Sequence, residues 1–141
     1  MSTYNRILVA VDLSPEARIV ITRASELAQH YGAALQLIHV VEPLIAMDDY
    51  ELVPALPLEI EKTLEQRANT FLASLLSDMG MGDTEVVVGI GAPKREILGY
   101  AKEHDIDLIV IGAHGRHGIA TASASAARRK PRSVSVAPDG F

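Results

Sequence analysis

The chain has 141 residues, 48% of them hydrophobic, and a formal net charge of −5. This length suits one domain with a single core, and the negative charge disfavours a nucleic-acid phosphate backbone as a partner. The absence of cysteine excludes disulfides, thiolate nucleophiles and cysteine-ligated metal sites. No apolar run approaches the length of a membrane span and no leader-like pattern precedes the first apolar run. We therefore expect one soluble, cytoplasmic domain over residues 1–141, with no membrane contact.

The first part of the sequence predicts a strand, a helix and a second strand. Residues 7–11 (ILVAV) form a continuous apolar run, typical of a strand buried on both faces. A Ser-Pro-Glu sequence at 14–16 then supplies a capping side chain, a proline for the first helical position and an early acid. Apolar residues at helical spacing continue to Gly32, and residues 35–41 predict the second strand. This unit is one right-handed crossover between parallel strands.

Further helix–strand units follow a proline-containing segment, 42–57, that we interpret as a loop. A long amphipathic helix comes next, and its predicted apolar face consists of Ile60, Leu64, Ala68, Phe71, Leu75 and Met79. Residues 85–90 predict a third strand, a helix opens at Pro93, and residues 107–111 (DLIVI) predict a fourth buried strand. That third helix presents Ile97, Leu98 and Ala101 as its apolar residues. Such alternation predicts an α/β fold, an open parallel sheet with helices on both faces.

The last part of the chain differs in composition. Between residues 120 and 133 there is no Leu, Ile, Val, Met or aromatic residue, so a helix there would have only alanines to bury. We therefore expect 119–132 to be the least stable segment. Valines alternating with serines then predict a short fifth strand, with Ser133 and Ala137 as its first and last residues. An edge strand invites pairing with a second copy, so we expect a homodimer through this strand.

Two turns would meet at the carboxyl end of this sheet. Asp12 follows the first strand, and a glycine-rich sequence, GAHGRHG, follows the fourth. Open α/β sheets bind ligands where the strand order reverses, and glycines let backbone N–H groups approach phosphate oxygens closely. Either turn alone is typical of an ordinary connection. Their coincidence at one switch point favours a ligand site.

Several enzyme classes are excluded by missing motifs. No GxGxxG follows the first strand, and neither GxxxxGK[ST] nor GxSxG occurs, which removes dehydrogenases, P-loop NTPases and α/β-hydrolases. His114 and His117 have H-x-x-H spacing but no third ligand near them in sequence, so we expect no metal site. His39 lies on a predicted strand and is interpreted as a packed or capping histidine. The serines lack a recognisable base partner, so covalent catalysis is not supported.

Four segments together resemble the universal stress protein family over nearly the whole chain. They are NRILVAVDLS at the start, LIHVVE on the second strand, GAPKREIL opening the third helix, and the most specific, DLIVIGAHGRHG. The resemblance implies a Rossmann-like, five-stranded parallel sheet of order 3-2-1-4-5 and a homodimer. In the nucleotide-binding branch of the family it also implies ATP or AMP between strands 1 and 4, with Mg²⁺ as a further candidate.

The resemblance assigns residues to the base and ribose side of that site. Asp12 matches the acidic residue near the ribose and phosphates, and Val40 matches the strand-2 residue whose backbone reads the adenine edge. Ala10 and Ile111 would flank the base.

On the phosphate side the match is partial. The branch is marked by G-x-x-G, nine residues, then G-[ST]. Gly112 and Gly115 match the first half, with His114 between them as a further candidate ligand. After nine intervening residues, 116–124, stand Ser125 and Ala126, where the branch has Gly followed by Ser or Thr. Ser125 is the candidate phosphate ligand there.

Three hypotheses for function follow. The first is an adenine-nucleotide-binding regulatory protein that acts in stress response through its homodimer and an unidentified protein partner. The second is a dimeric interaction module that binds no nucleotide because the phosphate motif is incomplete. The third, a slow phosphohydrolase, finds no positioned base or nucleophile beyond Asp12, so we expect no enzyme.

Overall fold

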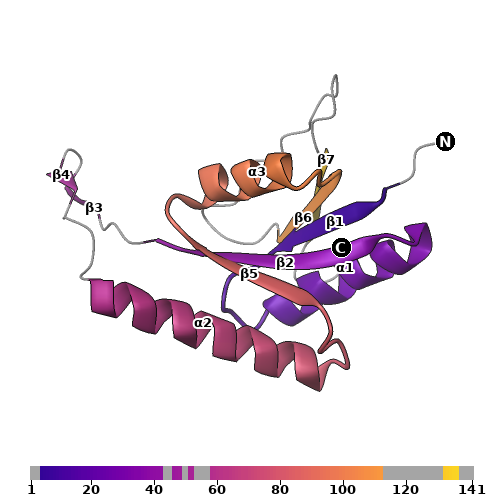
Figure 1. Cartoon of the computed structure of the whole chain (residues 1–141), viewed down its shortest axis with the longest axis horizontal. Coiled ribbons are helices and arrows are strands. Elements are labelled where there is room, and N and C mark those ends of the chain that lie inside the picture. Colours follow the sequence, from indigo (N-terminus) through magenta and orange to yellow (C-terminus); the bar gives the residue numbers. More distant parts are fainter. Residues whose placement is uncertain (1–3, 43–45, 49–50, 53–57, 113–131, 137–141) are drawn as a thin grey trace.

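The computed structural model describes residues 4–42, 46–48, 51–52, 58–112 and 132–136 (Figure 1). Its main sheet has five strands in the order β5-β2-β1-β6-β7, and every neighbouring pair is parallel. These strands are β1 (Arg6–Ala10), β2 (Ala34–Val41), β5 (Glu85–Ile90), β6 (Leu108–Gly112) and β7 (Arg132–Val136). The predicted α/β class with a parallel sheet is confirmed, and four predicted strands lie within one residue of their expected bounds.

The helices cover both faces of this sheet, as predicted. Figure 1 shows α3 (Pro93–Glu103) on one face and α1 (Ala17–Tyr31) with α2 (Leu58–Asp78) on the other. Successive strand residues point to opposite faces, so each buried strand feeds two cores. In β1, Ile7 and Val9 pack with α1 and α2, whereas Leu8 and Ala10 pack with α3.

The segment expected to be a loop contains two short strands. β3 (Ala46–Asp48) and β4 (Glu51–Leu52) pair antiparallel in a separate two-stranded sheet. The prediction of a loop over 42–57 is therefore wrong in part. Its prolines interrupt the segment but leave room for a pair of strands only a few residues long.

The two ends of α1 differ in how well the sequence predicted them. Gly32 adopts a left-handed conformation, φ 66°, and ends the helix as expected. The predicted N-terminal cap is wrong: the capping position is Glu16, with no side-chain capping hydrogen bond. The Ser14 hydroxyl donates to Asp12 Oδ1 at 2.6 Å, so it is engaged before the helix begins.

Two predicted apolar faces contain exposed residues. Ile60 and Phe71 of α2 are 45% and 39% exposed, and Leu98 of α3 is 43% exposed. The residues of α2 buried against the sheet are Ala68, Leu72 and Leu76. The helix was predicted correctly and its buried face in part, since Ala68 is buried and Leu75 and Met79 pack against the core.

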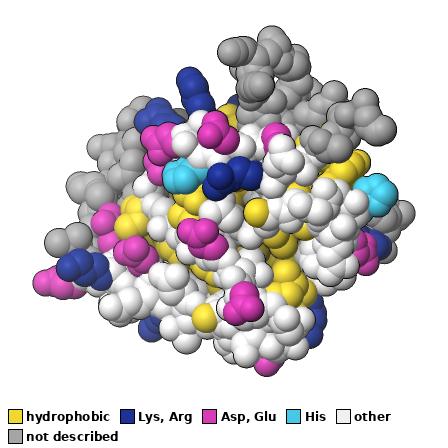
Figure 2. Space-filling model, turned by 45° about the vertical axis from the view of Figure 1, so that its right-hand side comes forward, with side chains coloured by type: hydrophobic (Ala, Val, Ile, Leu, Met, Phe, Trp, Pro, Cys, Tyr) yellow, Lys and Arg dark blue, Asp and Glu magenta, His cyan; other side chains and the backbone are white. Residues whose placement is uncertain are grey.

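Polar side chains close the end of the sheet where the strands begin. Both carboxylate oxygens of Asp107 accept backbone N–H groups, from Asn5 at 3.0 Å and Arg6 at 3.1 Å, which fixes the start of β1 beside β6. Figure 2 brings this side of the molecule forward and shows acidic, basic and histidine side chains gathered on it. Asp107 therefore has a structural role at this end of the sheet.

A tyrosine at this end of the sheet should make the free energy of unfolding fall as the pH becomes alkaline. Burial raises the pKa of the Tyr100 hydroxyl, and the negative charge of Glu85 raises it further. Because the folded state holds this proton more tightly than the unfolded state, stability is fully present below the unfolded pKa of about 10 and is lost as pH rises through the folded pKa. We expect Tyr100→Phe to lose less stability than wild type between about pH 9 and 11 in urea titrations. Tyr31→Phe is the control, and an equal alkaline loss in Tyr100→Phe and wild type would contradict the assignment.

Candidate functional site

The strand order reverses at β1, which lies between β2 and β6. In register, Ala10 stands beside Ile38 on one side and beside Ile111 on the other. Ala10, Val40 and Ile111 all belong to the core on the α3 face and are 9%, 8% and 4% exposed. The structure thus brings these predicted residues together at the carboxyl ends of three adjacent strands.

Asp12 shapes the turn that leaves β1. Its Oδ1 accepts hydrogen bonds from the Ser14 backbone N–H at 3.1 Å and from the Ser14 hydroxyl at 2.6 Å. Such a bond from a side chain to the backbone two residues on is a common way for Asp to fix a turn. The residue is exposed. Because both bonds use Oδ1, Oδ2 is left to accept a hydrogen bond from a ligand.

The backbone of Val40 faces the same opening. The Val11 N–H donates to the Ile38 carbonyl at 3.0 Å, and the Gly91 N–H donates to the Val41 carbonyl at 2.9 Å. Alternation along β2 therefore directs the N–H and C=O of Val40 toward β1, beyond the last paired residue, Ala10. Within the described chain neither group has a backbone partner. One donor and one acceptor on a single residue thus remain for a ligand.

Gly112 has a packing reason for lacking a side chain. A Cβ built there would lie 3.3 Å from Val20 Cγ2 on α1, closer than most real Cβ contacts. The absence of a side chain therefore lets β6 and α1 approach closely. A role of this backbone toward phosphate stays a prediction.

Sequence reasoning missed a contact between Gly91 and Glu96, both in the segment GAPKREIL. Gly91 has φ +147°, and a Cβ there would lie 2.8 Å from Glu96 Oε2. Gly89, two residues earlier, lies under the same carboxylate. A Cβ built on Gly89 would lie 3.8 Å from Glu96 Oε1, which is an ordinary van der Waals distance. The Glu96 carboxylate therefore lies over the end of β5, and both its proximity and the φ of +147° favour glycine at position 91.

This contact predicts different costs for two glycine-to-alanine changes. Gly91→Ala should lower the free energy of unfolding by about 1–3 kcal/mol, because alanine is strained at this φ and its Cβ would collide with Glu96. Gly89→Ala, the matched control, should change it by less than about 0.5 kcal/mol. Urea denaturation of both variants measures the difference. Equal costs would show that the Glu96 carboxylate does not constrain this turn.

The other predicted site residues are not placed. His114, Gly115 and Ser125 lie outside the described residues, as does most of the segment 119–132. In the part of the chain that is described, no group of three or more His, Asp or Glu side chains is arranged to hold a metal ion. The geometry therefore concerns the base and ribose side of the candidate site.

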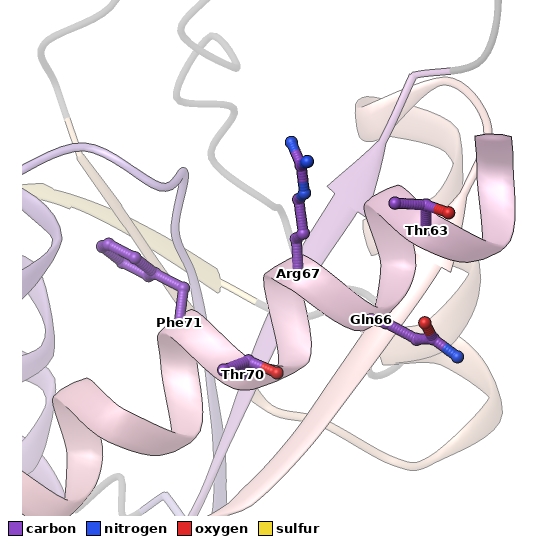
Figure 3. A pocket seen from close by; sticks show the side chains of 5 residues that line it. All are labelled: Thr63, Gln66, Arg67, Thr70 and Phe71. Carbon is purple, nitrogen blue, oxygen red and sulfur yellow. The ribbon is translucent and has the colours of Figure 1, made fainter.

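A hollow on the outer side of α2 is not part of this site. It encloses about 340 Å³ and is lined by Thr63, Gln66, Arg67, Thr70 and Phe71. Figure 3 shows that all of these side chains project from α2 alone, with Arg67 directed away from Gln66 and Thr70. Its one charged lining residue is Arg67. The hollow offers no chemistry comparable to that of the strand ends.

Comparison with known proteins decides the family. The sequence profile described as "Universal stress protein family" matches residues 3–129. The chain belongs to the universal stress protein family. Universal stress protein A homolog 2 of Coxiella burnetii is 36% identical over 120 residues, covering 84% of this chain and 82% of that protein. The resemblance noted from four sequence segments is thereby confirmed.

Solved structures of the family share the fold. A universal stress protein from Burkholderia pseudomallei superposes with a TM-score of 0.64 at 20% identity, covering 96% of this chain and 98% of that one. The universal stress protein from Archaeoglobus fulgidus in complex with dAMP gives a TM-score of 0.58 at 22% identity, over 95% and 98% of the two chains. No helix in the described ranges combines the length and apolarity needed to cross a bilayer.

Proposed function

We propose that this universal stress protein binds an adenine nucleotide at the carboxyl ends of β1, β2 and β6. The observation that supports this best is the N–H and C=O of Val40, which have no backbone partner within the described chain and lie beside the buried Ala10 and Ile111. Adenine presents an amino donor next to a ring-nitrogen acceptor, which complements a backbone acceptor and donor. Guanine presents a carbonyl and an N–H at these positions and would set acceptor against acceptor and donor against donor.

The remaining parts of the ligand fit the neighbouring residues. Ala10 and Ile111 supply apolar surface for the base, and Asp12 Oδ2, which the two bonds from Ser14 do not use, is the proposed acceptor for a ribose hydroxyl. The dAMP complex of the Archaeoglobus fulgidus relative supports an adenosine phosphate as the ligand class. The ligand is ATP or AMP, the former with Mg²⁺, and Gly112, His114, Gly115 and Ser125 are the proposed phosphate side.

The nucleotide would act as a signal and not as a substrate for turnover. Among the carboxylates that the structure describes at these strand ends, Asp12 is the candidate base, and its Oδ1 is already bonded to Ser14. We propose a cytoplasmic stress-response regulator that transmits its nucleotide state through a homodimer to a protein partner. The alternative is a dimeric interaction module without nucleotide, since Ser125 and Ala126 replace the Gly-[ST] of the phosphate motif.

Nucleotide detection separates these two functions. Protein purified without added ligand is denatured, and the released small molecules are identified by mass spectrometry. Titration calorimetry with AMP, ATP and GMP then follows on the emptied protein. We expect an adenosine phosphate to co-purify and AMP or ATP to bind more tightly than GMP. No released nucleotide and no heat with AMP or ATP at millimolar concentrations would favour the interaction module.

The dimer can be tested at β7, which is the strand at one edge of the sheet beside β6. An edge strand has one unpaired row of backbone groups, and a second copy can pair with it. We expect light scattering to give a dimer at micromolar concentration and Val136→Pro to weaken it at least tenfold, since proline removes a backbone donor. A wild-type monomer would contradict the proposed interface.

A further inference from the structure

His39 bonds to the backbone of the neighbouring strand. Its ring Nδ1 lies 2.9 Å from the carbonyl oxygen of Val11. A carbonyl oxygen can only accept, so in this contact Nδ1 bears the hydrogen and donates it. The ring thereby joins the end of β2 to the first residue after β1.

This bond lies where the β1–β2 ladder would otherwise continue. The last register pair is Ala10 with Ile38, so Val11 with His39 would be the next. In a parallel ladder that pair needs two backbone bonds, Val11 N–H to Ile38 C=O and Val40 N–H to Val11 C=O. The first is made at 3.0 Å, whereas the second is absent from the backbone bonds of the described residues. The imidazole occupies the carbonyl that Val40 N–H would have used.

We infer that His39 is a positioning residue that ends the ladder one bond early and keeps the Val40 N–H free for the base of the ligand. The claim about the ligand rests on the proposed function; the claim about the ladder does not. Without the imidazole, Val11 C=O would be left without its partner and the Val40 N–H would be its nearest backbone donor. Forming that bond would remove the donor from the site.

The same bond connects the two halves of the site. Val11 directly precedes Asp12, whose carboxylate fixes the turn through Ser14. By bonding to Val11, His39 fixes the point at which the chain leaves β1, so the base-reading residue and the ribose-binding residue keep their relative positions. His39 need not touch the ligand to do this.

Two substitutions of the same size separate the hydrogen bond from packing. Asparagine places an amide N–H close to the position of Nδ1, so His39→Asn should preserve the bond to Val11. Leucine has nearly the same shape as asparagine and no donor, so His39→Leu should let the ladder close. Circular dichroism of both variants establishes that they are folded.

The first measurement is amide hydrogen exchange by NMR in the ligand-free protein. Ile38 and Val40 have buried side chains, 2% and 8% exposed, on the same strand and face, which makes Ile38 an internal reference. In wild type and His39→Asn we expect the Val40 amide to exchange at least about tenfold faster than that of Ile38. In His39→Leu the two rates should become similar.

The second measurement is calorimetry with AMP and with ribose 5-phosphate, which lacks the base. His39→Leu should bind AMP about tenfold more weakly, the equivalent of one lost backbone hydrogen bond, and His39→Asn within about twofold of wild type. Ribose 5-phosphate affinity should be the same in all three proteins. A general structural defect would weaken both ligands.

Two results would overturn the inference. One is a Val40 amide as protected as Ile38 in ligand-free wild type, a comparison that stands even if His39→Leu does not fold. The other is a folded His39→Leu that leaves the Val40 exchange rate unchanged. If wild type binds no adenine nucleotide, the proposed function fails, while the exchange rates still decide whether His39 ends the ladder.

Discussion

Replacing Leu72 by alanine should lower the free energy of unfolding by about 2–5 kcal/mol, whereas replacing its neighbour Phe71 should cost less than about 1 kcal/mol. Leu72 is fully buried in the core between α2 and the sheet, together with Leu37 and Val9. Its removal leaves a cavity that the close-packed strands cannot fill. Phe71 is the larger side chain but is 39% exposed on the outer side of the helix.

Urea denaturation followed by circular dichroism measures both costs, and unchanged m-values would show that the two variants unfold in the same way as wild type. Leu76→Ala, at a side chain 1% exposed, is a second core variant and should resemble Leu72→Ala. A larger cost for Phe71→Ala than for Leu72→Ala would mean that α2 is rotated relative to the sheet.

The same pair of residues shows why the helix could be predicted fully and its buried face only in part. α2 has apolar residues at 71, 72, 75 and 76, so two neighbouring stripes both satisfy helical spacing. The expected stripe passed through Phe71 because periodicity alone does not choose between them. In the structure Leu72 and Leu76 are the residues buried against the sheet, where they pack in one cluster with aliphatic residues of β1 and β2.

The strands were predictable for a simpler reason. Strands covered on both faces need mostly apolar runs; β1 and β6 are largely continuous runs, and β2 is interrupted only by Gln36 and His39. By contrast, β3 and β4 are only 3 and 2 residues long, too short for any pattern to show. At the start of α1, the Ser-Pro-Glu sequence fits a cap, but the helix has Glu16 at its capping position, and the Ser14 hydroxyl donates to Asp12 in the preceding turn.

The position of the candidate site could be predicted from the sequence, but not all of the contacts within it. Carboxyl ends of parallel strands meet at one end of a sheet, so Asp12 was expected there, and the family resemblance added Ala10, Val40 and Ile111. His39 was interpreted as a packed or capping histidine, and the structure confirms that it caps the Val11 carbonyl. What this bond does to Val40 depends on strand register, which no local pattern contains. The Gly91–Glu96 contact likewise needs the angle at which α3 leaves β5.

Replacing Asp12 by alanine should weaken AMP binding about 10- to 100-fold. In the proposed site its Oδ2 accepts a ribose hydroxyl, and a hydrogen bond to a charged group contributes about 1.5–3 kcal/mol. Alanine also removes the two bonds that Oδ1 makes to Ser14, at 3.1 and 2.6 Å, so the turn would lose its fixed shape. The lost ribose hydrogen bond and the loosened turn should both weaken AMP binding.

Ser14→Ala separates them, because it deletes the 2.6 Å hydroxyl bond but keeps the carboxylate and the bond from the Ser14 backbone N–H. We expect this variant to bind AMP within about threefold of wild type, since one neutral bond is lost at an exposed turn. Asp12→Asn should fall between the two, because the amide oxygen still accepts but without charge. Calorimetry with AMP on the three variants gives the order. If Ser14→Ala weakens binding as much as Asp12→Ala, the aspartate acts only through the turn and Oδ2 does not hold the ribose. Unchanged AMP affinity in Asp12→Ala would place the nucleotide elsewhere on the protein.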